Sequence, residues 1–269
     1  MTLTELYTLL DMPVEAVALL DAAAQTDLSW LTEEMISRYY TRATAAEGLE
    51  AIRAHLGEDP DGFRLLWVLL TLCCRTWAQY EALGIPAEVF AATMKFIPRF
   101  LRDHHAKHGT WDFHWGWWFW RQLSMAEFRV GCLEYEFIRN ADGEGEVSLH
   151  IPADADLSPA SVDASFAAFR DFMARFYPEW AQEKWVCDSW MMSPVLENFL
   201  DEGSNVLAFQ RRFIPEHTGY GYEGVLDWVF PPHREVSCDL PENTSLQRRL
   251  KPWLLAGNKV GWTRAVLRT

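Results

Sequence analysis

The segment Val147-Ser-Leu-His150-Ile-Pro152 alternates apolar and polar side chains until it meets a proline. A period of two is typical of a strand that buries one face. The segments 184–190 and 204–214 are also short and rich in apolar residues, and a Ser-Pro pair at 158–159 is typical of the start of a helix between the first two strands. Short strands connected by single helices predict a sheet with helices packed on it in the second half of the chain.

The residues on either side of this segment predict the rest of the sheet. Residues 128–139 are expected to form one strand, in which apolar side chains alternate with Glu134 and Glu136. Residues 140–143, Asn-Ala-Asp-Gly, have the composition of a hairpin turn that leads into the segment quoted above. Further strands are expected over residues 224–230 and 260–267.

The first half of the chain predicts helices only. They are expected over residues 3–10, 13–24, 29–43, 45–56, 63–83, 86–107 and 111–124. The last of these is rich in tryptophan, and we expect its aromatic side chains to be buried as part of the core. The fold prediction is therefore α+β: an all-helical N-terminal domain, residues 1–125, packed on a mixed β-sheet with flanking helices, residues 126–269.

Composition restricts the classes of partner. The 269 residues carry a formal net charge of −14, with 24 Lys and Arg against 38 Asp and Glu. Nucleic acids and anionic membrane surfaces attract clustered positive charge, so neither is an expected partner. The five cysteines match no disulfide or zinc spacing, and the polar start of the chain is unlike a secretory signal, so a cytoplasmic protein is expected.

No metal site is expected from the sequence. His104 and His108 are spaced to share one face of a helix, as two zinc ligands would, and His105 and His114 are nearby. The glutamate of a His-Glu-x-x-His motif is missing, and His104 and His108 lie just before Gly109, a residue that ends helices. A polar helix terminus is the favoured interpretation.

Four phrases of the second half resemble those of a bacterial acyltransferase family. They are Leu149-His-Ile-Pro, Val186-Cys-Asp-Ser-Trp, Leu207-Ala-Phe-Gln-Arg-Arg-Phe and Thr244-Ser-Leu-Gln-Arg. Members of this family join a helical N-acyltransferase N-terminal domain to a GNAT-like C-terminal domain. The resemblance implies a GNAT-like sheet and the transfer of an acyl group from acetyl-CoA or another acyl-CoA to a small-molecule amine.

One turn departs from the GNAT pattern. GNAT enzymes hold the pyrophosphate of coenzyme A on the backbone of a glycine-containing loop between a strand and a helix. The corresponding residues 152–158 contain no glycine and carry Asp154 and Asp156, whose negative charges would repel phosphates. The alternative function is therefore a noncatalytic ligand-binding or regulatory module on a degenerate GNAT-like scaffold.

Glu134, Glu136 and His150 are the candidate catalytic residues. The two glutamates point to one face of their expected strand, where a partly buried carboxylate could accept the proton of an attacking amine. A solvated strand face would give the same pattern. His150 faces away from the apolar row of its own strand, so it could exchange a proton near neutral pH or serve as a structural histidine.

Cys187, Ser189 and Trp190 are candidate substrate-binding residues at the end of the strand 184–190. A covalent role for Cys187, as in an acyl carrier or hydrolase, would need a base such as His150 within hydrogen-bond reach. A buried cysteine that packs as a small apolar residue is the favoured alternative. Ser189 could orient a substrate carbonyl or bond to the backbone.

Arginines supply the candidate anion sites. Strand periodicity over residues 204–214 puts Arg211 and Arg212 on opposite faces, so one of them must lie beside apolar neighbours and have an internal carboxylate or a ligand as its partner. The resemblance implies that Arg212 lines the substrate pocket. Arg248 and Arg249 belong to a compact basic cluster that could bind the 3′-phosphate of coenzyme A. A solvated helix face is the alternative for that cluster.

Overall fold

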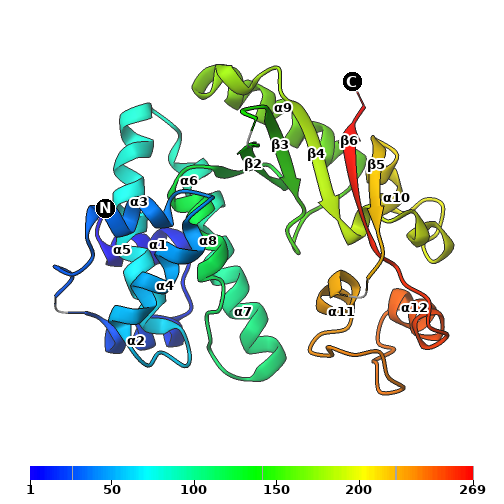
Figure 1. Cartoon of the computed structure of the whole chain (residues 1–269), viewed down its shortest axis with the longest axis horizontal. Coiled ribbons are helices and arrows are strands. Elements are labelled where there is room, and N and C mark those ends of the chain that lie inside the picture. The colour runs from blue at the N-terminus through cyan, green and yellow to red at the C-terminus, as the bar shows by residue number, and fades with distance from the viewer. Residues whose placement is uncertain (26, 141, 222, 269) are drawn as a thin grey trace. The chain divides into compact units, whose positions relative to one another are not determined.

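The computed structural model describes residues 1–269 except 26, 141, 222 and 269 (Figure 1). The chain divides into two compact units, Met1–Arg129 and Val130–Thr269. The described part of the first unit is helical up to the strand at its end, whereas the second unit carries most of a mixed sheet together with helices. The predicted α+β class is confirmed.

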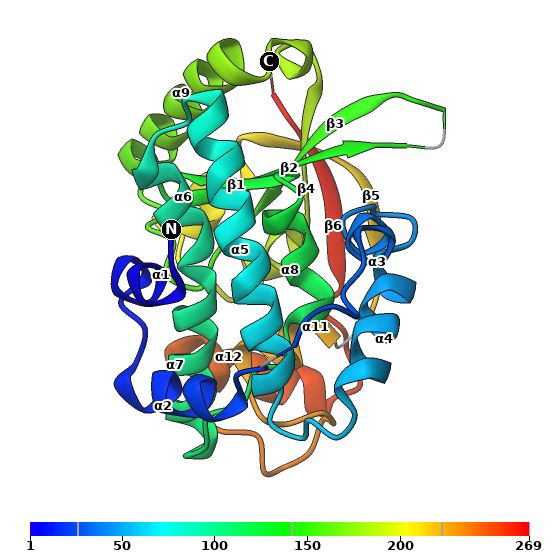
Figure 2. The ribbon, with the colours of Figure 1, turned by 90° about the vertical axis from the view of Figure 1, so that its left-hand side faces the viewer.

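The N-terminal unit is built from the helices drawn in blue to green in Figure 2. These are α1 (Leu3–Leu10), α2 (Val14–Ala23), α3 (Glu33–Tyr39), α4 (Ala45–Leu56), α5 (Phe63–Leu83), α6 (Ala87–Met94), α7 (Phe96–His108) and α8 (Gly116–Leu123). The long helix α5 is the centre of this unit, because ten of its residues are buried and α1, α2, α4, α6 and α8 all contact it. None of the described helices has the length and apolar character needed to cross a membrane.

Capping interactions fix where these helices begin. Thr2 and Glu5 form a reciprocal capping box at the start of α1. At the start of α5, the carboxylate of Asp59 accepts hydrogen bonds from the backbone N–H groups of Arg64, at 2.9 Å, and Leu65, at 2.8 Å. These bonds satisfy N–H groups that have no partner inside the helix.

Gly62 is expected to tolerate no side chain. It has a φ of 75°, and a Cβ built on it would lie 2.0 Å from the carbonyl oxygen of Phe113. Gly62→Ala is therefore expected to lower the free energy of unfolding by more than the ~1–2 kcal/mol that a left-handed backbone alone costs. Thermal unfolding checks this prediction, with Gly84→Ala as the matched control, since Gly84 has a φ of 68° and open space at its Cβ. Equal losses in both variants would contradict the predicted clash.

The sheet has the strand order β1-β2-β3-β4-β6-β5 in the described chain. The strands are β1 (Glu127–Val130), β2 (Leu133–Arg139), β3 (Gly145–His150), β4 (Lys184–Ser189), β5 (Phe213–Gly219) and β6 (Trp262–Leu267). β2 and β3 are antiparallel, β3 and β4 are parallel, and β6 runs antiparallel to both β4 and β5. The parallel pair is connected by helix α9 (Pro159–Phe176), as a crossover connection requires.

The two faces of this sheet differ in chemistry. One face packs against α9: Tyr135 stacks on Phe169 with ring centroids 3.8 Å apart, and Trp185 meets the edge of the same ring. Leu149 and Cys187 are cross-strand partners on this apolar face and are buried. The opposite face carries Glu136, Ser148, His150, Asp188 and Arg264, and we call it the polar face.

A second apolar cluster of this unit lies away from α9. It forms between α11 (Glu223–Val229), α12 (Ser245–Leu255) and the short 3-10 helix η3 (Pro194–Asn198), around Phe230 and Leu250. Ser193 caps η3 and Thr244 caps α12 through a capping box with Gln247. Two further 3-10 helices, η1 (Pro178–Trp180) and η2 (Trp190–Met192), flank β4.

Two predicted strands are wrong, because residues 204–214 and 224–230 contain helices. The first segment forms α10 (Asn205–Gln210) and then enters β5, and the second is α11. Ser204 caps Val206, and the amide of Gln210 donates to the carbonyl oxygens of Met191, at 2.5 Å, and Ser193, at 3.1 Å. Apolar segments this short have no periodicity that separates a strand from a helix, so tertiary contacts determine which of the two they form.

Three predicted boundaries are also corrected. Residues 128–139 are two strands rather than one, because Gly131, with a φ of 68°, makes a turn between β1 and β2. Residues 86–107 are divided between α6 and α7, and the helix predicted at 29–43 begins only after Thr32, whose side chain caps it. The hairpin turn predicted at 140–143 includes residue 141, which lies outside the described residues.

The tryptophan-rich segment is less buried than predicted. The helix α8 begins at Gly116, after the expected start at Trp111. Phe119 and Trp120 are buried as expected, whereas Trp117 keeps 52% of its surface exposed.

Candidate active site

The carboxyl ends of β3 and β4 define the candidate site. Their parallel pairing runs from Glu146 opposite Lys184 to Leu149 opposite Cys187, so His150 and Asp188 come next on the two strands. Ligands of α/β sheets bind where adjacent parallel strands end, because the loops there diverge and leave room. His150 and Asp188 both belong to the polar face, one residue beyond a pair that faces α9.

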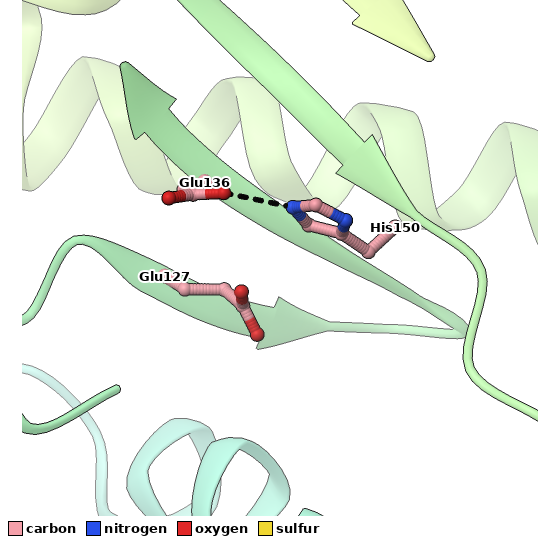
Figure 3. A group of neighbouring side chains, drawn as sticks. All are labelled: Glu127, Glu136 and His150. Carbon is pink, nitrogen blue, oxygen red and sulfur yellow. Dashed lines mark hydrogen bonds and ion pairs between the residues drawn. The ribbon is translucent and has the colours of Figure 1, made fainter. Parts of the chain in front are cut away.

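Glu136 and His150 form a direct contact at this position. The Nε2 atom of His150 lies 3.0 Å from Oε2 of Glu136 (Figure 3). The Glu136 side chain is 1% exposed, whereas the His150 side chain is 24% exposed. The imidazole is therefore the member of this pair that a substrate can reach, and the carboxylate is placed to orient it.

Glu134 lies next to this pair. It is the cross-strand partner of His150 and is 6% exposed. Both predicted glutamates are thus buried rather than on a solvated strand face. The structure brings together all three predicted catalytic residues.

Glu127 on β1 joins Glu136 and His150 (Figure 3). One potential ligand atom of each lies within 4.8 Å of the others, a grouping found among the described residues. Gln122 donates a hydrogen bond of 2.6 Å to Glu127. Two carboxylates and an imidazole are a donor set that a divalent cation such as zinc accepts.

Charged residues continue across the polar face beyond His150. Arg264 on β6 makes a two-pronged contact with Glu146, at 2.6 and 3.2 Å, and a third contact of 3.2 Å with Glu216. The bonds to Glu146 raise the pKa of Arg264 above its ordinary value. Desolvation raises the pKa of Asp188, although the residue keeps solvent access, while the positive charge of Arg264 acts in the opposite direction.

Sequence reasoning missed Asp188, Glu146 and Arg264 as site residues. The signal was available for Glu146, which alternates with Ser148 and His150 on one strand. Arg264 carried no such signal, since only the pairing of β6 with β4 puts it opposite Asp188.

The candidate substrate-binding residues Cys187 and Ser189, on β4, and Trp190, in η2, have different surroundings. Cys187 faces α9, and burial raises the pKa of its thiol to about 12. The Ser189 hydroxyl accepts a hydrogen bond of 3.1 Å from the N–H of Met191 and so caps η2. Trp190 packs against the cluster around Phe230.

Native Cys187 is expected to resist alkylation by iodoacetamide at neutral pH. The thiolate is the reactive form, and a thiol that is buried with a raised pKa supplies almost none of it. Cys238 is exposed and serves as the internal control, to be labelled within the same sample. Mass spectrometry of the two peptides checks this prediction. Labelling of Cys187 at the rate of Cys238 would restore the hypothesis of a cysteine nucleophile.

The three candidate arginines are engaged within the protein. Arg212 pairs with Asp163 and also donates to the carbonyl oxygen of Pro159, and both partners lie near the start of α9. Its predicted place on a strand beside Gln210 is wrong, because α10 occupies that segment. Arg248 donates to the carbonyl oxygen of Glu242 at 2.9 Å, and Arg249 to that of Phe199 at 2.7 Å.

The turn between β3 and α9 is organised around Asp156. Its carboxylate accepts hydrogen bonds from the Ser161 hydroxyl, at 2.5 Å, and from the N–H and hydroxyl of Ser158, at 2.9 Å each. These bonds, the Ser161 bond first, lower the pKa of Asp156, so the carboxylate is ionised at neutral pH. The Ser158 hydroxyl in turn caps the N–H of Ser161. The first turn of α9 is thus occupied by a carboxylate and a serine cap.

Comparison with protein families finds two adjoining matches. Residues 1–125 match the N-acyltransferase N-terminal domain, and residues 128–267 match the GNAT-like C-terminal domain. The sequence matches none of the curated proteins with which it was compared.

Solved structures with the same fold include acyltransferases. One, in complex with decanoyl-CoA and teicoplanin, is 24% identical, with 98% of this chain and 86% of that chain covered and a TM-score of 0.79. A mutant acyltransferase in complex with octanoyl-CoA is 22% identical over 98% and 87% of the two chains, also with a TM-score of 0.79. A third, in complex with CoA and 10C-teicoplanin, is 23% identical with the same coverage and TM-score. At sequence identities this low, the structural similarity establishes a common fold and nothing further.

Proposed function

Because the chain belongs to the family that joins an N-acyltransferase N-terminal domain to a GNAT-like C-terminal domain, we propose that it transfers an acyl group from an acyl-CoA to the amine of a small molecule. The observation that carries this proposal is the Glu136–His150 pair at the carboxyl end of β3. A solvent-accessible imidazole oriented by a buried carboxylate is the arrangement of a general base.

In this mechanism His150 takes the proton of the acceptor amine. The amine nitrogen attacks the thioester carbonyl carbon, a C–N bond forms, and the C–S bond breaks to release coenzyme A as a thiolate. The proton lost by the amine passes to the other ring nitrogen of His150, Nδ1, and then to the departing thiolate, so the histidine returns to its initial state. Glu136 contacts Nε2, so it fixes the ring orientation and stabilises the imidazolium that forms.

The rest of the polar face supports an amine as the acceptor. Asp188 follows on the neighbouring strand, and Arg264 is already paired with Glu146 and Glu216. A solvent-accessible carboxylate near His150 attracts the ammonium form of an amine. The ammonium group must first release one proton to solvent, and His150 then takes the proton that the neutral amine loses as it attacks. The acyltransferases of similar fold that were solved with octanoyl-CoA and decanoyl-CoA support a medium-chain acyl-CoA as the donor.

A titration with acyl donors tests this function. Coenzyme A, acetyl-CoA, octanoyl-CoA and decanoyl-CoA are added in a thermal-shift experiment, with ATP as the control for generic nucleotide binding. A ligand at one hundred times its dissociation constant stabilises the folded protein by about 2.7 kcal/mol, which is an easily measured shift. Stabilisation by the thioesters and not by ATP is expected.

Acyl transfer itself is measured by mass spectrometry of the acceptor. Teicoplanin and simple primary amines are incubated with the stabilising thioester, and an added acyl mass with release of free coenzyme A thiol is the expected result. Binding of thioesters without transfer to any amine of the panel would remove the catalytic proposal and leave a binding protein.

A noncatalytic ligand-binding module is the second candidate. The glycine-free turn favours it, because ionised Asp156 occupies the first turn of α9, where GNAT proteins bind pyrophosphate. This candidate predicts no stabilisation by any coenzyme A thioester. Asp156→Asn, together with Asp154→Asn, would then be expected to restore thioester binding by removing the repulsion.

A further inference from the structure

A group of histidines surrounds one carboxylate at the end of α7 in the N-terminal unit. His104 and His108 are four residues apart on the last turns of α7, and their rings lie 4.5 Å apart between centroids. Gly109 ends the helix with a φ of 73°, and the chain turns back through residues 110–115 before α8 begins. This turn brings Asp112 and His114 to His104.

The contacts converge on a single oxygen atom. Oδ2 of Asp112 lies 3.0 Å from Nε2 of His104 and 3.9 Å from Nε2 of His114. The hydroxyl of Thr110 donates a hydrogen bond of 3.2 Å to the same oxygen. The ring centroids of His104 and His114 are 5.9 Å apart, with the planes at 71°.

A polar helix terminus explains only half of this group. Histidines in the last turn of a helix interact favourably with its negative end, which accounts for His104 and His108. The same field disfavours a carboxylate beside that end, so it does not account for Asp112. His114 lies outside the helix altogether. Lys107 forms an ion pair of 2.7 Å with Asp103, so Asp103 rather than Asp112 is the partner of this lysine.

We propose that His104, Asp112 and His114 bind a divalent transition-metal ion, for which zinc is the best match. Imidazole nitrogen and carboxylate oxygen are preferred zinc ligands, and His108, whose ring centroid lies 4.5 Å from that of His104, is a further imidazole for the fourth position. This site is separate from the Glu127, Glu136 and His150 group, which belongs to the proposed active site. The proposal is independent of the proposed acyl transfer.

The rearrangement that binding requires falls on the exposed side chain of His114. Zinc lies about 2.0–2.1 Å from nitrogen and oxygen ligands, so neighbouring ligand atoms of a tetrahedral site are about 3.3 Å apart. The His104–Asp112 separation of 3.0 Å is already close to this value. His114 must approach from 3.9 Å, and 60% of its side chain is exposed, so it can rotate without disturbing the core.

Metal binding would tie the end of α7 to the connection that leads into α8. His104 belongs to the helix, whereas Asp112 and His114 belong to the connection. A bound ion therefore closes a loop of the chain and stabilises the folded state by an amount that rises with the logarithm of the metal concentration above the dissociation constant. Zinc is thus expected to raise the temperature of unfolding, and EDTA to reverse that rise.

The test is calorimetric titration of the full-length protein, freed of metal with EDTA, with zinc chloride. Zinc binding is expected at this site, and His114→Gln and Asp112→Asn are each expected to raise its dissociation constant there by about 100-fold or more, since loss of even an outer-shell partner costs about 10- to 100-fold. Any zinc bound by the Glu127, Glu136 and His150 group should be unaffected by these two variants. His105→Asn is the matched control: it lies on the same helix, but its ring stacks on Trp111, and zinc affinity is expected to remain unchanged. Cobalt(II) provides a second readout, since a tetrahedral site gives visible absorption bands that both ligand variants should lose.

Three results would overturn the proposal. Zinc could give no binding heat and no thermal shift. His114→Gln and Asp112→Asn could bind zinc as tightly as the unaltered protein. His105→Asn could weaken binding as much as the ligand variants, which would indicate diffuse binding to surface histidines. Because His114 is largely exposed, His114→Gln is expected to fold normally, and an unchanged unfolding temperature without metal verifies this.

Discussion

Replacing His150 with glutamine is expected to lower kcat of acyl transfer by about 10²- to 10⁴-fold, the range that a general base contributes. Glutamine keeps the approximate length of the side chain and can still bond to Glu136, but it cannot accept a proton from the amine. The thermal shift produced by the acyl donor should stay unchanged, since His150 is proposed to act on the acceptor. His233→Gln, at a histidine outside the polar face, is the control and should retain full activity.

Glu136→Gln separates orientation from proton transfer. Glu136 contacts Nε2 of His150 and is buried, so its proposed role is to orient the ring rather than to touch the substrate. Its amide form should lower kcat less than His150→Gln does. The double variant should be no slower than His150→Gln alone, because residues that act as a unit are not additive. The pH dependence of the rate should shift in Glu136→Gln and disappear in His150→Gln.

Two outcomes would contradict this assignment. If Glu136→Gln is inactive while His150→Gln retains activity, the carboxylate is the base and the histidine is its support. If both variants transfer the acyl group at the unaltered rate, the pair is structural, and Glu134 and Asp188 become the next residues to replace. If single replacements of His150, Glu136, Glu134 and Asp188 all leave full activity, this face of the sheet has no part in the mechanism.

The sequence predicted this site well where alternation alone places the side chains. Glu134, Glu136 and His150 lie on strands whose apolar residues repeat with a period of two, so their common face follows from the pattern and the hairpin. Arg212 was misplaced for the opposite reason. Residues 204–214 are too short and too apolar for periodicity to separate strand from helix, and the contacts of Gln210 with the backbone near η2 favour the helix.

The charges beyond His150 could not be derived from the sequence. Arg264 and Glu146 are 118 residues apart, and their contact depends on the insertion of β4 between β3 and β6. The order of strands in a sheet is set by packing over the whole unit, which no local pattern records. Likewise, the histidines of α7 share a face by helical spacing, whereas the approach of Asp112 depends on the turn at Gly109.

Phe169→Ala is expected to cost about 3–5 kcal/mol of unfolding free energy in the C-terminal unit, because it removes a buried aromatic side chain and leaves a cavity. Phe169 is fully buried at the centre of α9 and stacks on Tyr135 at 3.8 Å. It also contacts Phe172 and meets the edge of Trp185. The apolar face of β2 and β4 therefore loses its main contact with the helix.

Hydrogen exchange measured by mass spectrometry is the suitable readout for this variant. A chain with two compact units need not unfold in one step, so a single transition temperature would average their responses. Faster exchange is expected in peptides from β2, β4 and α9, whereas peptides from α5 in the N-terminal unit should be unaffected. Phe176→Ala is the control on the same helix, since Phe176 is only partly buried and a smaller effect is expected. If neither variant exchanges faster than the unaltered protein in these peptides, α9 contributes little to holding the strands in position. The proposed geometry of Glu136 and His150 would then need another source of rigidity.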